Sequence, residues 1–228
     1  MKAFNLLMKS HQIERYKACA TSAMRDAKNG QELAKLVKKE SDIDIEIIDG
    51  EHEAAIIAAT DLHTLIQDDK TYLYVDVGGG STEFIIGERF ETLALESLHM
   101  GCVSFRERYF KNGKITAKGM QKAITYASRE LLNIKYRFQA LGWQTSIGSS
   151  GSIKAIAQVI ENLGFSQEGI TEQSLDQLKA HIISLGHIDK LQDLGVKKDR
   201  LSIFPSGLAI LCACFEVLTI DSMTYADG

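Results

Sequence analysis

The sequence predicts an α/β protein whose sheets mix parallel and antiparallel strands. Short apolar patterns typical of strands alternate with helical patterns along the chain, and three strand patterns follow one another directly at 72–98. The composition is that of a globular protein, with 45% hydrophobic residues, 25% charged residues and a single proline. At 228 residues, the chain suits one large domain or two small ones.

Charge and apolar runs narrow the possible functions. The formal net charge of −4 provides no basic field for nucleic acid or a membrane surface. No run reaches the ~18 apolar residues of a membrane span, and the N-terminal segment is too polar after Leu7 for a signal peptide. None of the four cysteines forms a CxxC pair, so we expect buried thiols and a cytoplasmic protein, with peripheral membrane association left open.

The first part of the chain alternates helices with short strands. Asn29-Gly30 should interrupt a helix at 24–40, whose buried stripe would be Leu33, Leu36 and Val37. A charged connector at 68–70 suggests two domains, 1–68 and 69–228. The other expected elements are a helix at 3–11, strands at 15–21 and 43–48, and a helix at 51–67 with Ala54, Ala55, Ala58 and Leu62 on one face.

The second part begins with the three-strand meander. Thr116 should cap a long helix that ends near Gly142, and Thr171 and Ser174 form a capping signature. Pro205 suits the start of a helix. We expect strands at 72–77, 84–86, 92–98, 144–147 and 223–226, and helices at 102–110, 116–140, 153–163, 171–185, 188–194 and 206–218.

A glycine-rich turn joins the first two strands of the meander. Asp76 and Glu83 flank it, and its three glycines would leave backbone N–H groups bare for a phosphate. The two acids are candidates to hold a divalent cation or a water. The alternative is an ordinary hairpin with two solvated acids. The predicted phosphate-binding residues of this turn are Gly78, Gly79, Gly80, Ser81 and Thr82.

A second glycine-hydroxyl segment lies between the strand at 144–147 and the next helix. Its sequence, GSSGS, places small residues where the positive end of a helix attracts anions. It matches neither the Walker pattern nor the dinucleotide pattern, and a plain connector is the alternative. The predicted phosphate-binding residues here are Gly148, Ser149, Ser150 and Gly151.

Together these stretches resemble the exopolyphosphatase/guanosine pentaphosphate phosphatase (Ppx/GppA) family. The resemblance implies two actin-like ATPase (ribonuclease H-like) domains, and the segment at 99–105 is more similar to the exopolyphosphatase branch. The matching stretches, in family order, are ATSAMRDAKNG at 20–30, IEIIDGEHEA at 45–54, DVGGGSTE at 76–83, HMGCVSF at 99–105, GSSGSIKA at 148–155 and FPSGLAILCACFEVL at 204–218.

The resemblance implies a metal-dependent hydrolase that releases orthophosphate from the end of inorganic polyphosphate. Glu53 matches the general base and Arg25 a phosphate-contacting arginine. Asp76 and Glu83 match acids associated with Mg²⁺ and the reacting phosphate, with a monovalent cation such as K⁺ as an option. His52 stands where the family usually has an acid, so we expect a substitution there and not a ligand.

The sequence departs from the family pattern at both ends. It lacks the family's first phosphate loop, of the type Asp-x-Gly-Ser-Asn-Ser, and it stops where the family continues. We therefore expect a fragment with an incomplete first domain, and a homodimer formed through an unpaired strand edge near 15–21. The alternatives are a guanosine pentaphosphate 5′-phosphohydrolase linked to the stringent response, a phosphate- or nucleotide-binding fragment without turnover, and a kinase relative.

Overall fold

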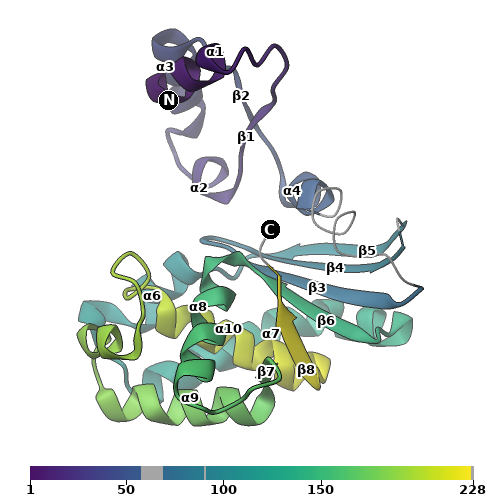
Figure 1. Cartoon of the computed structure of the whole chain (residues 1–228), viewed down its shortest axis with the longest axis vertical. Coiled ribbons are helices and arrows are strands. Elements are labelled where there is room, and N and C mark those ends of the chain that lie inside the picture. Colours follow the sequence, from purple (N-terminus) through teal and green to yellow (C-terminus); the bar gives the residue numbers. More distant parts are fainter. Residues whose placement is uncertain (58–68, 90, 227–228) are drawn as a thin grey trace. The chain divides into compact units, whose positions relative to one another are not determined.

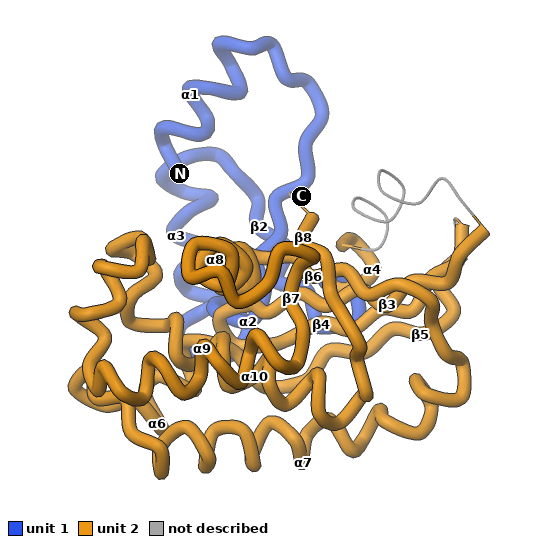
Figure 2. Tube along the Cα trace, turned by 60° about the horizontal axis from the view of Figure 1, so that its bottom comes forward, with its two compact units in different colours: residues 1–53 blue, residues 54–228 orange. Residues whose placement is uncertain are grey.

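The computed structural model describes residues 1–57, 69–89 and 91–226 (Figure 1). The chain divides into two compact units, residues 1–53 and residues 54–228 (Figure 2). The division falls inside helix α4 (Gly50–Ile57). The predicted boundary at 68–70 begins at a residue outside the described ranges, so the domain limits 1–68 and 69–228 stay a prediction.

Unit 1 contains a two-stranded parallel sheet and three helices before α4. Strand β1 pairs with β2 so that Cys19 lies opposite Glu46. The predicted helix break is confirmed at Gly30, where a Cβ atom would lie 1.9 Å from the carbonyl oxygen of Met24, so only glycine fits. The elements are α1 (Lys2–Ser10), β1 (Ala18–Ala20), α2 (Ser22–Arg25), α3 (Gly30–Ser41) and β2 (Ile45–Ile47).

The predicted buried stripe of α3 is wrong. Leu33 is 42% exposed and Leu36 is 53% exposed, and Val37 is only partly buried. Helical spacing selects an apolar face, but burial needs a partner surface, which two three-residue strands are too small to provide. On α4, Ala54 is buried and Ala55 is exposed, whereas Ala58 and Leu62 lie outside the described residues.

Unit 2 is built on a mixed sheet of strand order β5-β4-β3-β6-β8-β7, which confirms the predicted class. Strands β3, β6 and β8 are parallel to one another, while β4, β5 and β7 run antiparallel to their neighbours. The two-residue β7 was not predicted. The strands are β3 (Thr71–Val77), β4 (Thr82–Glu88), β5 (Glu91–Leu98), β6 (Thr145–Ser149), β7 (Ile170–Thr171) and β8 (Ser222–Tyr225).

The helices of unit 2 lie under one face of this sheet (Figure 1). Thr116 caps α7 by accepting a hydrogen bond from Gly119 N, and Thr171 and Ser174 form the predicted capping box of α9. Pro205 lies in the first turn of α10 as expected. The helices are α6 (Cys102–Tyr109), α7 (Ala117–Leu141), α8 (Ser150–Asn162), α9 (Glu172–Leu185) and α10 (Phe204–Leu218), with 3₁₀ turns η2 (Lys111–Gly113) and η3 (Ile188–Leu194).

Alternation along β3 assigns its residues to two faces. Leu73, Val75 and Val77 join the core formed with the helical layer. Tyr72 and Tyr74 pack in a smaller cluster on the other face, together with the buried Ala54 of α4. Because strand residues alternate in direction, Asp76 shares the face of Tyr72 and Tyr74.

The thiols divide into one exposed cysteine and three buried ones. Cys19 is exposed, which corrects the expectation that the cysteines are buried. Burial raises the pKa of the Cys102 thiol to about 11 and that of Cys212 to about 12, and it also raises the pKa of Cys214. The nucleophilic form of a cysteine is the thiolate, so the three buried thiols should be inert near neutral pH.

We therefore expect a thiol reagent at pH 8 to modify Cys19 alone in the folded chain. Denaturant should make all four thiols reactive, because unfolding removes the burial that raises the pKa values of Cys102, Cys212 and Cys214. Alkylation followed by mass spectrometry measures the number of modified cysteines in the folded chain and in denaturant. Rapid modification of Cys102 in the folded protein at pH 8 would contradict the burial of that thiol.

Candidate active site

A row of polar side chains crosses four strands at one end of the unit 2 sheet. Asp76 lies directly opposite Glu83 on β4 and Ser149 on β6. Glu83 in turn faces Ser97 on β5, whose hydroxyl donates a 2.8 Å hydrogen bond to Glu83 Oε1. Glu83 is 1% exposed and Ser149 is 7% exposed. Directly opposed strand residues share one face, so these four side chains form one continuous line.

The glycine turn follows at the ends of these strands. Gly78 N donates to Ser81 O at 3.0 Å, which closes the turn. Its carbonyl groups face helix α6, because Gly78 O accepts from Cys102 N at 3.0 Å and Gly79 O accepts from Val103 N at 2.9 Å. Within the described residues, the N–H groups of Gly79 and Gly80 have no hydrogen-bond partner. Two of the N–H groups predicted to receive a phosphate are thus available.

The turn is packed so closely on the start of α6 that only glycine fits at Gly101. A Cβ atom there would lie 2.3 Å from Gly79 O and 2.4 Å from Gly80 N, and both atoms belong to backbone. Backbone cannot rotate away as a side chain can, so the turn itself would have to move.

We expect Gly101→Ala to destabilise the fold by about 1–3 kcal/mol, since overpacking a tight contact has this cost. Thermal unfolding measures the change in midpoint. Gly79→Ala is the matched comparison for stability, because a Cβ atom there meets only a Val103 methyl group at 3.6 Å. Equal midpoints for the two variants would contradict the close packing at Gly101.

Unlike the bare N–H groups, the hydroxyl-bearing residues of the turn are buried. Thr82 is buried and its hydroxyl donates to Met100 O at 2.5 Å. A hydroxyl has one proton, so in this arrangement Thr82 has none left for a phosphate. Ser81 is buried as well. The hydroxyl contacts predicted for Ser81 and Thr82 stay predictions.

The second glycine-hydroxyl segment is not a loop, which corrects the sequence interpretation. Strand β6 runs through Gly148 to Ser149, and α8 begins at Ser150, which has a positive φ of 91°. The space over Gly148 is filled, because a Cβ atom there would lie 2.7 Å from both Ile153 and Met223 side-chain atoms. Small polar residues inside β6 hid the end of the strand from an apolar-pattern argument.

Arg200 lies against the second glycine-hydroxyl segment, a contact that the sequence did not indicate. Its guanidinium lies over Gly151, where a Cβ atom would be 2.5 Å from Arg200 Nη2. Burial raises the pKa of the Cys102 thiol, while the charge of Arg200 lowers it and that of Asp76 raises it slightly further. The charged stretch around Arg200 is typical of a solvated connector, so no pattern distinguished it.

Unit 1 brings together the two residues that the family resemblance assigns there. Arg25 Nη1 donates to Ile48 O at 3.0 Å and lies 3.5 Å from Glu53 Oε2. Glu53 Oε2 is buried and has no hydrogen-bond partner in the part of the chain that the structure describes. A carboxylate oxygen in this state can accept a hydrogen bond from a water.

His52, next to Glu53, is directed elsewhere. Its backbone N–H donates to Asp49 Oδ1 at 2.8 Å, and its ring Nδ1 lies 2.9 Å from the same oxygen. These hydrogen bonds lower the pKa of the Asp49 carboxyl group. The His52 side chain is largely exposed, and the expectation that it is a substitution and not a ligand stays a prediction.

The fit to a divalent cation rests on Asp76 and Glu83. Within residues 1–57, 69–89 and 91–226, no group of three or more histidine, cysteine or acidic residues could hold a metal ion. Mg²⁺ is commonly held by one or two carboxylates, with waters and substrate phosphates as its other ligands. Two carboxylates at paired strand positions beside a phosphate-sized turn suit this type of site.

The whole chain, residues 1–228, matches the model of the Ppx/GppA phosphatase family. The protein belongs to this family. The putative exopolyphosphatase of Haemophilus influenzae is 38% identical over 216 residues, which cover 95% of this chain and 67% of that protein. The guanosine-5′-triphosphate,3′-diphosphate pyrophosphatase of Aliivibrio fischeri MJ11 is 39% identical over 216 residues, which cover 95% of this chain and 43% of that protein. The family resemblance is confirmed, but identities this similar do not favour either branch.

Solved Ppx/GppA structures share the fold. The Aquifex aeolicus family member has a TM-score of 0.80 at 24% identity and covers 99% of this chain and 74% of its own. The Cytophaga hutchinsonii exopolyphosphatase has a TM-score of 0.82 at 23% identity and covers 99% of this chain and 75% of its own. These matches confirm the predicted actin-like ATPase fold with mixed sheets. No helix among the described residues is both long and apolar enough to cross a membrane.

Proposed function

We propose that this Ppx/GppA protein is a metal-dependent hydrolase that releases orthophosphate from the end of inorganic polyphosphate. The observation that carries the proposal is the register of Asp76 and Glu83 beside the bare N–H groups of Gly79 and Gly80. Acids paired in this way, next to unpaired backbone donors, suit a phosphate that shares a cation with the protein. The name of the Haemophilus influenzae relative supports the substrate class.

The reaction that we propose, with the residue roles that the family resemblance implies, is attack of water on the terminal phosphorus with cleavage of the P–O–P bond. Glu53 would accept the proton of that water, and its buried Oε2, which accepts no hydrogen bond from a described residue, is suited to this role. Arg25 would stabilise negative charge on the phosphate oxygens. The N–H groups of Gly79 and Gly80 would hold the terminal phosphate. The leaving group would be the shortened polyphosphate, whose new terminal oxygen takes the electron pair of the broken P–O bond.

Asp76 and Glu83 would hold Mg²⁺ together with phosphate oxygens. When bound, the cation supplies positive charge that neutralises the phosphate oxygens. The chain itself keeps the two carboxylates apart at a fixed strand spacing, and the Ser97 hydroxyl orients Glu83. A contribution from K⁺ stays a proposal that omission of potassium from the buffer tests.

The deciding experiment measures orthophosphate released from medium-chain polyphosphate by the purified chain, with Mg²⁺ and with EDTA. Release that requires Mg²⁺ and proceeds from chain ends is the expected result. End-on cleavage is recognised by the early appearance of orthophosphate without fragments of intermediate length. Tight binding of phosphate without any release would support a binding fragment and overturn the proposed turnover.

Guanosine pentaphosphate is the second candidate substrate. The name of the Aliivibrio fischeri relative, a guanosine-5′-triphosphate,3′-diphosphate pyrophosphatase, supports it. Competition between polyphosphate and guanosine pentaphosphate at equal concentration tests the preference, which the comparisons leave even. ATP-dependent phosphorylation of a sugar would support a kinase instead. A cytoplasmic location and a link to the stringent response stay predictions of the family resemblance.

We also propose a homodimer formed through strand β1. Among the described residues, β1 pairs only with β2, so its second edge is unpaired. Unpaired edges favour pairing with another copy. Sedimentation should give twice the monomer mass, and oxidation should cross-link the chain through the exposed Cys19 on this edge. A monomer at all concentrations would contradict the proposal.

A further inference from the structure

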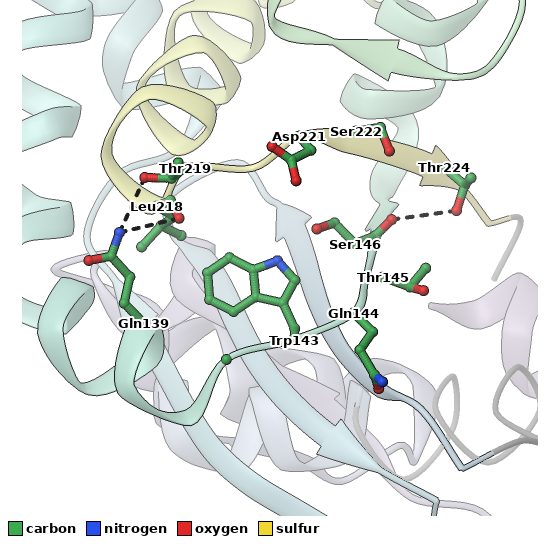
Figure 3. Close-up of a pocket in the computed structure, with 11 residues that line it drawn as sticks. Gln139, Trp143, Gln144, Thr145, Ser146, Leu218, Thr219, Asp221, Ser222 and Thr224 are labelled. Atoms are coloured by element: carbon green, nitrogen blue, oxygen red, sulfur yellow. Dashed lines mark hydrogen bonds between the residues drawn. The ribbon is translucent and has the colours of Figure 1, made fainter.

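A pocket of about 550 Å³ opens at the end of the unit 2 sheet opposite to the candidate active site. Its lining comes from the C-terminal ends of α7 and α10, the segments that follow them, and the first residues of β6 and β8 (Figure 3). Thr145 of the pocket and Ser149 of the active-site row lie four residues apart on β6, which is about 13 Å along a strand. The pocket is therefore distinct from the phosphate site.

Three side chains converge in this pocket, and two of them have polar groups without a hydrogen-bond partner among the described residues. Ser146 is 5% exposed, yet its hydroxyl makes no hydrogen bond within the described residues and points into the pocket (Figure 3). The Asp221 carboxylate forms no ion pair or hydrogen bond with any described residue and points toward the same space. Trp143, the only tryptophan of the chain, forms one wall with its indole ring. Because the Ser146 residue is buried while its hydroxyl stays accessible from the pocket, a ligand or water in the pocket can complete its hydrogen bonds.

The charged groups around the pocket favour a cationic ligand. Asp221 is the only ionisable residue in its lining, which contains no lysine, arginine or histidine. Helices α7 and α10 both end here, at Leu141 and Leu218, and the C-terminal end of a helix carries partial negative charge. Gln139 covers part of the second end only weakly, since its amide lies 3.5 Å from Leu218 O. An anion is disfavoured, and one carboxylate is too few for a tightly held metal ion.

We propose that this pocket binds a small organic cation through an ammonium or guanidinium group. The cation donates hydrogen bonds to Asp221 and to the Ser146 hydroxyl and packs against the indole ring of Trp143. The volume is in the range of sites that enclose a small molecule. The proposal depends on the pocket alone and does not require the hydrolase function.

The single tryptophan makes the test direct, because all indole fluorescence reports on the pocket. Putrescine, which has two ammonium groups, and agmatine, which adds a guanidinium, are titrated into the purified chain at constant ionic strength. We expect saturable quenching or a spectral shift with at least one of them. The same titration with sodium chloride should have no effect.

Asp221→Asn should weaken binding about fivefold, since a favourable exposed charge pair contributes about 1 kcal/mol. Ser146→Ala should weaken it as well, and isothermal calorimetry confirms both values independently of fluorescence. Glu168→Gln is the matched control, because Glu168 is an exposed carboxylate in the chain that is absent from the pocket lining. A signal that never saturates, or equal affinity in the Asp221→Asn and Glu168→Gln variants, overturns the proposal.

Discussion

Replacement of Glu53 by glutamine is expected to lower the rate of orthophosphate release by about 10²- to 10⁴-fold, the usual contribution of a general base. Glutamine keeps the size of the side chain and its place beside Arg25, but it cannot accept the proton of the attacking water. The loss should appear in kcat, with KM little changed, because Glu53 acts on the water and not on the affinity for substrate.

The matched control is Glu51→Gln, since Glu51 lies on the same helix and is exposed. That variant should retain the activity of the unmodified chain. Thermal unfolding of both variants excludes a loss caused by misfolding. If Glu53→Gln keeps a rate within about threefold of the parent, Glu53 is not the base, and the absence of a hydrogen bond at Oε2 needs another explanation.

Replacement of Asp76 by asparagine is expected to lower activity by about 10²-fold and to raise the Mg²⁺ concentration required for half-maximal rate. Asparagine has nearly the same shape as aspartate, so β3 and its pairing with Glu83 and Ser149 should be preserved. The negative charge that attracts the cation is lost, so added Mg²⁺ should restore part of the rate.

The control for this change is Asp69→Asn, which removes an equivalent charge just before the same strand. Asp69 is an exposed residue that pairs with Arg89 at 2.8 Å, and surface pairs of this kind contribute little to stability. The measurement is the rate as a function of Mg²⁺ concentration. An unchanged Mg²⁺ dependence of the rate in Asp76→Asn would show that Asp76 does not hold the cation.

Much of the fold was predictable because its signals are local. The caps at Thr116 and Thr171, the proline at the start of α10 and the three-strand meander are each set by neighbouring residues. The exposed face of α3 was not predictable, because the spacing of Leu33 and Leu36 does not reveal whether a partner surface exists.

The sequence by itself determined the family of this protein and the position of the glycine turn between two acids. Residue order along the chain carries both signals. Tertiary structure alone decided that Asp76 lies between Glu83 and Ser149, that Arg200 covers Gly151, and that Trp143 and Asp221 share a pocket. These contacts join residues about 50 to 80 positions apart (apart from Asp76 and Glu83), and strand register and helix packing create them, which no local pattern encodes.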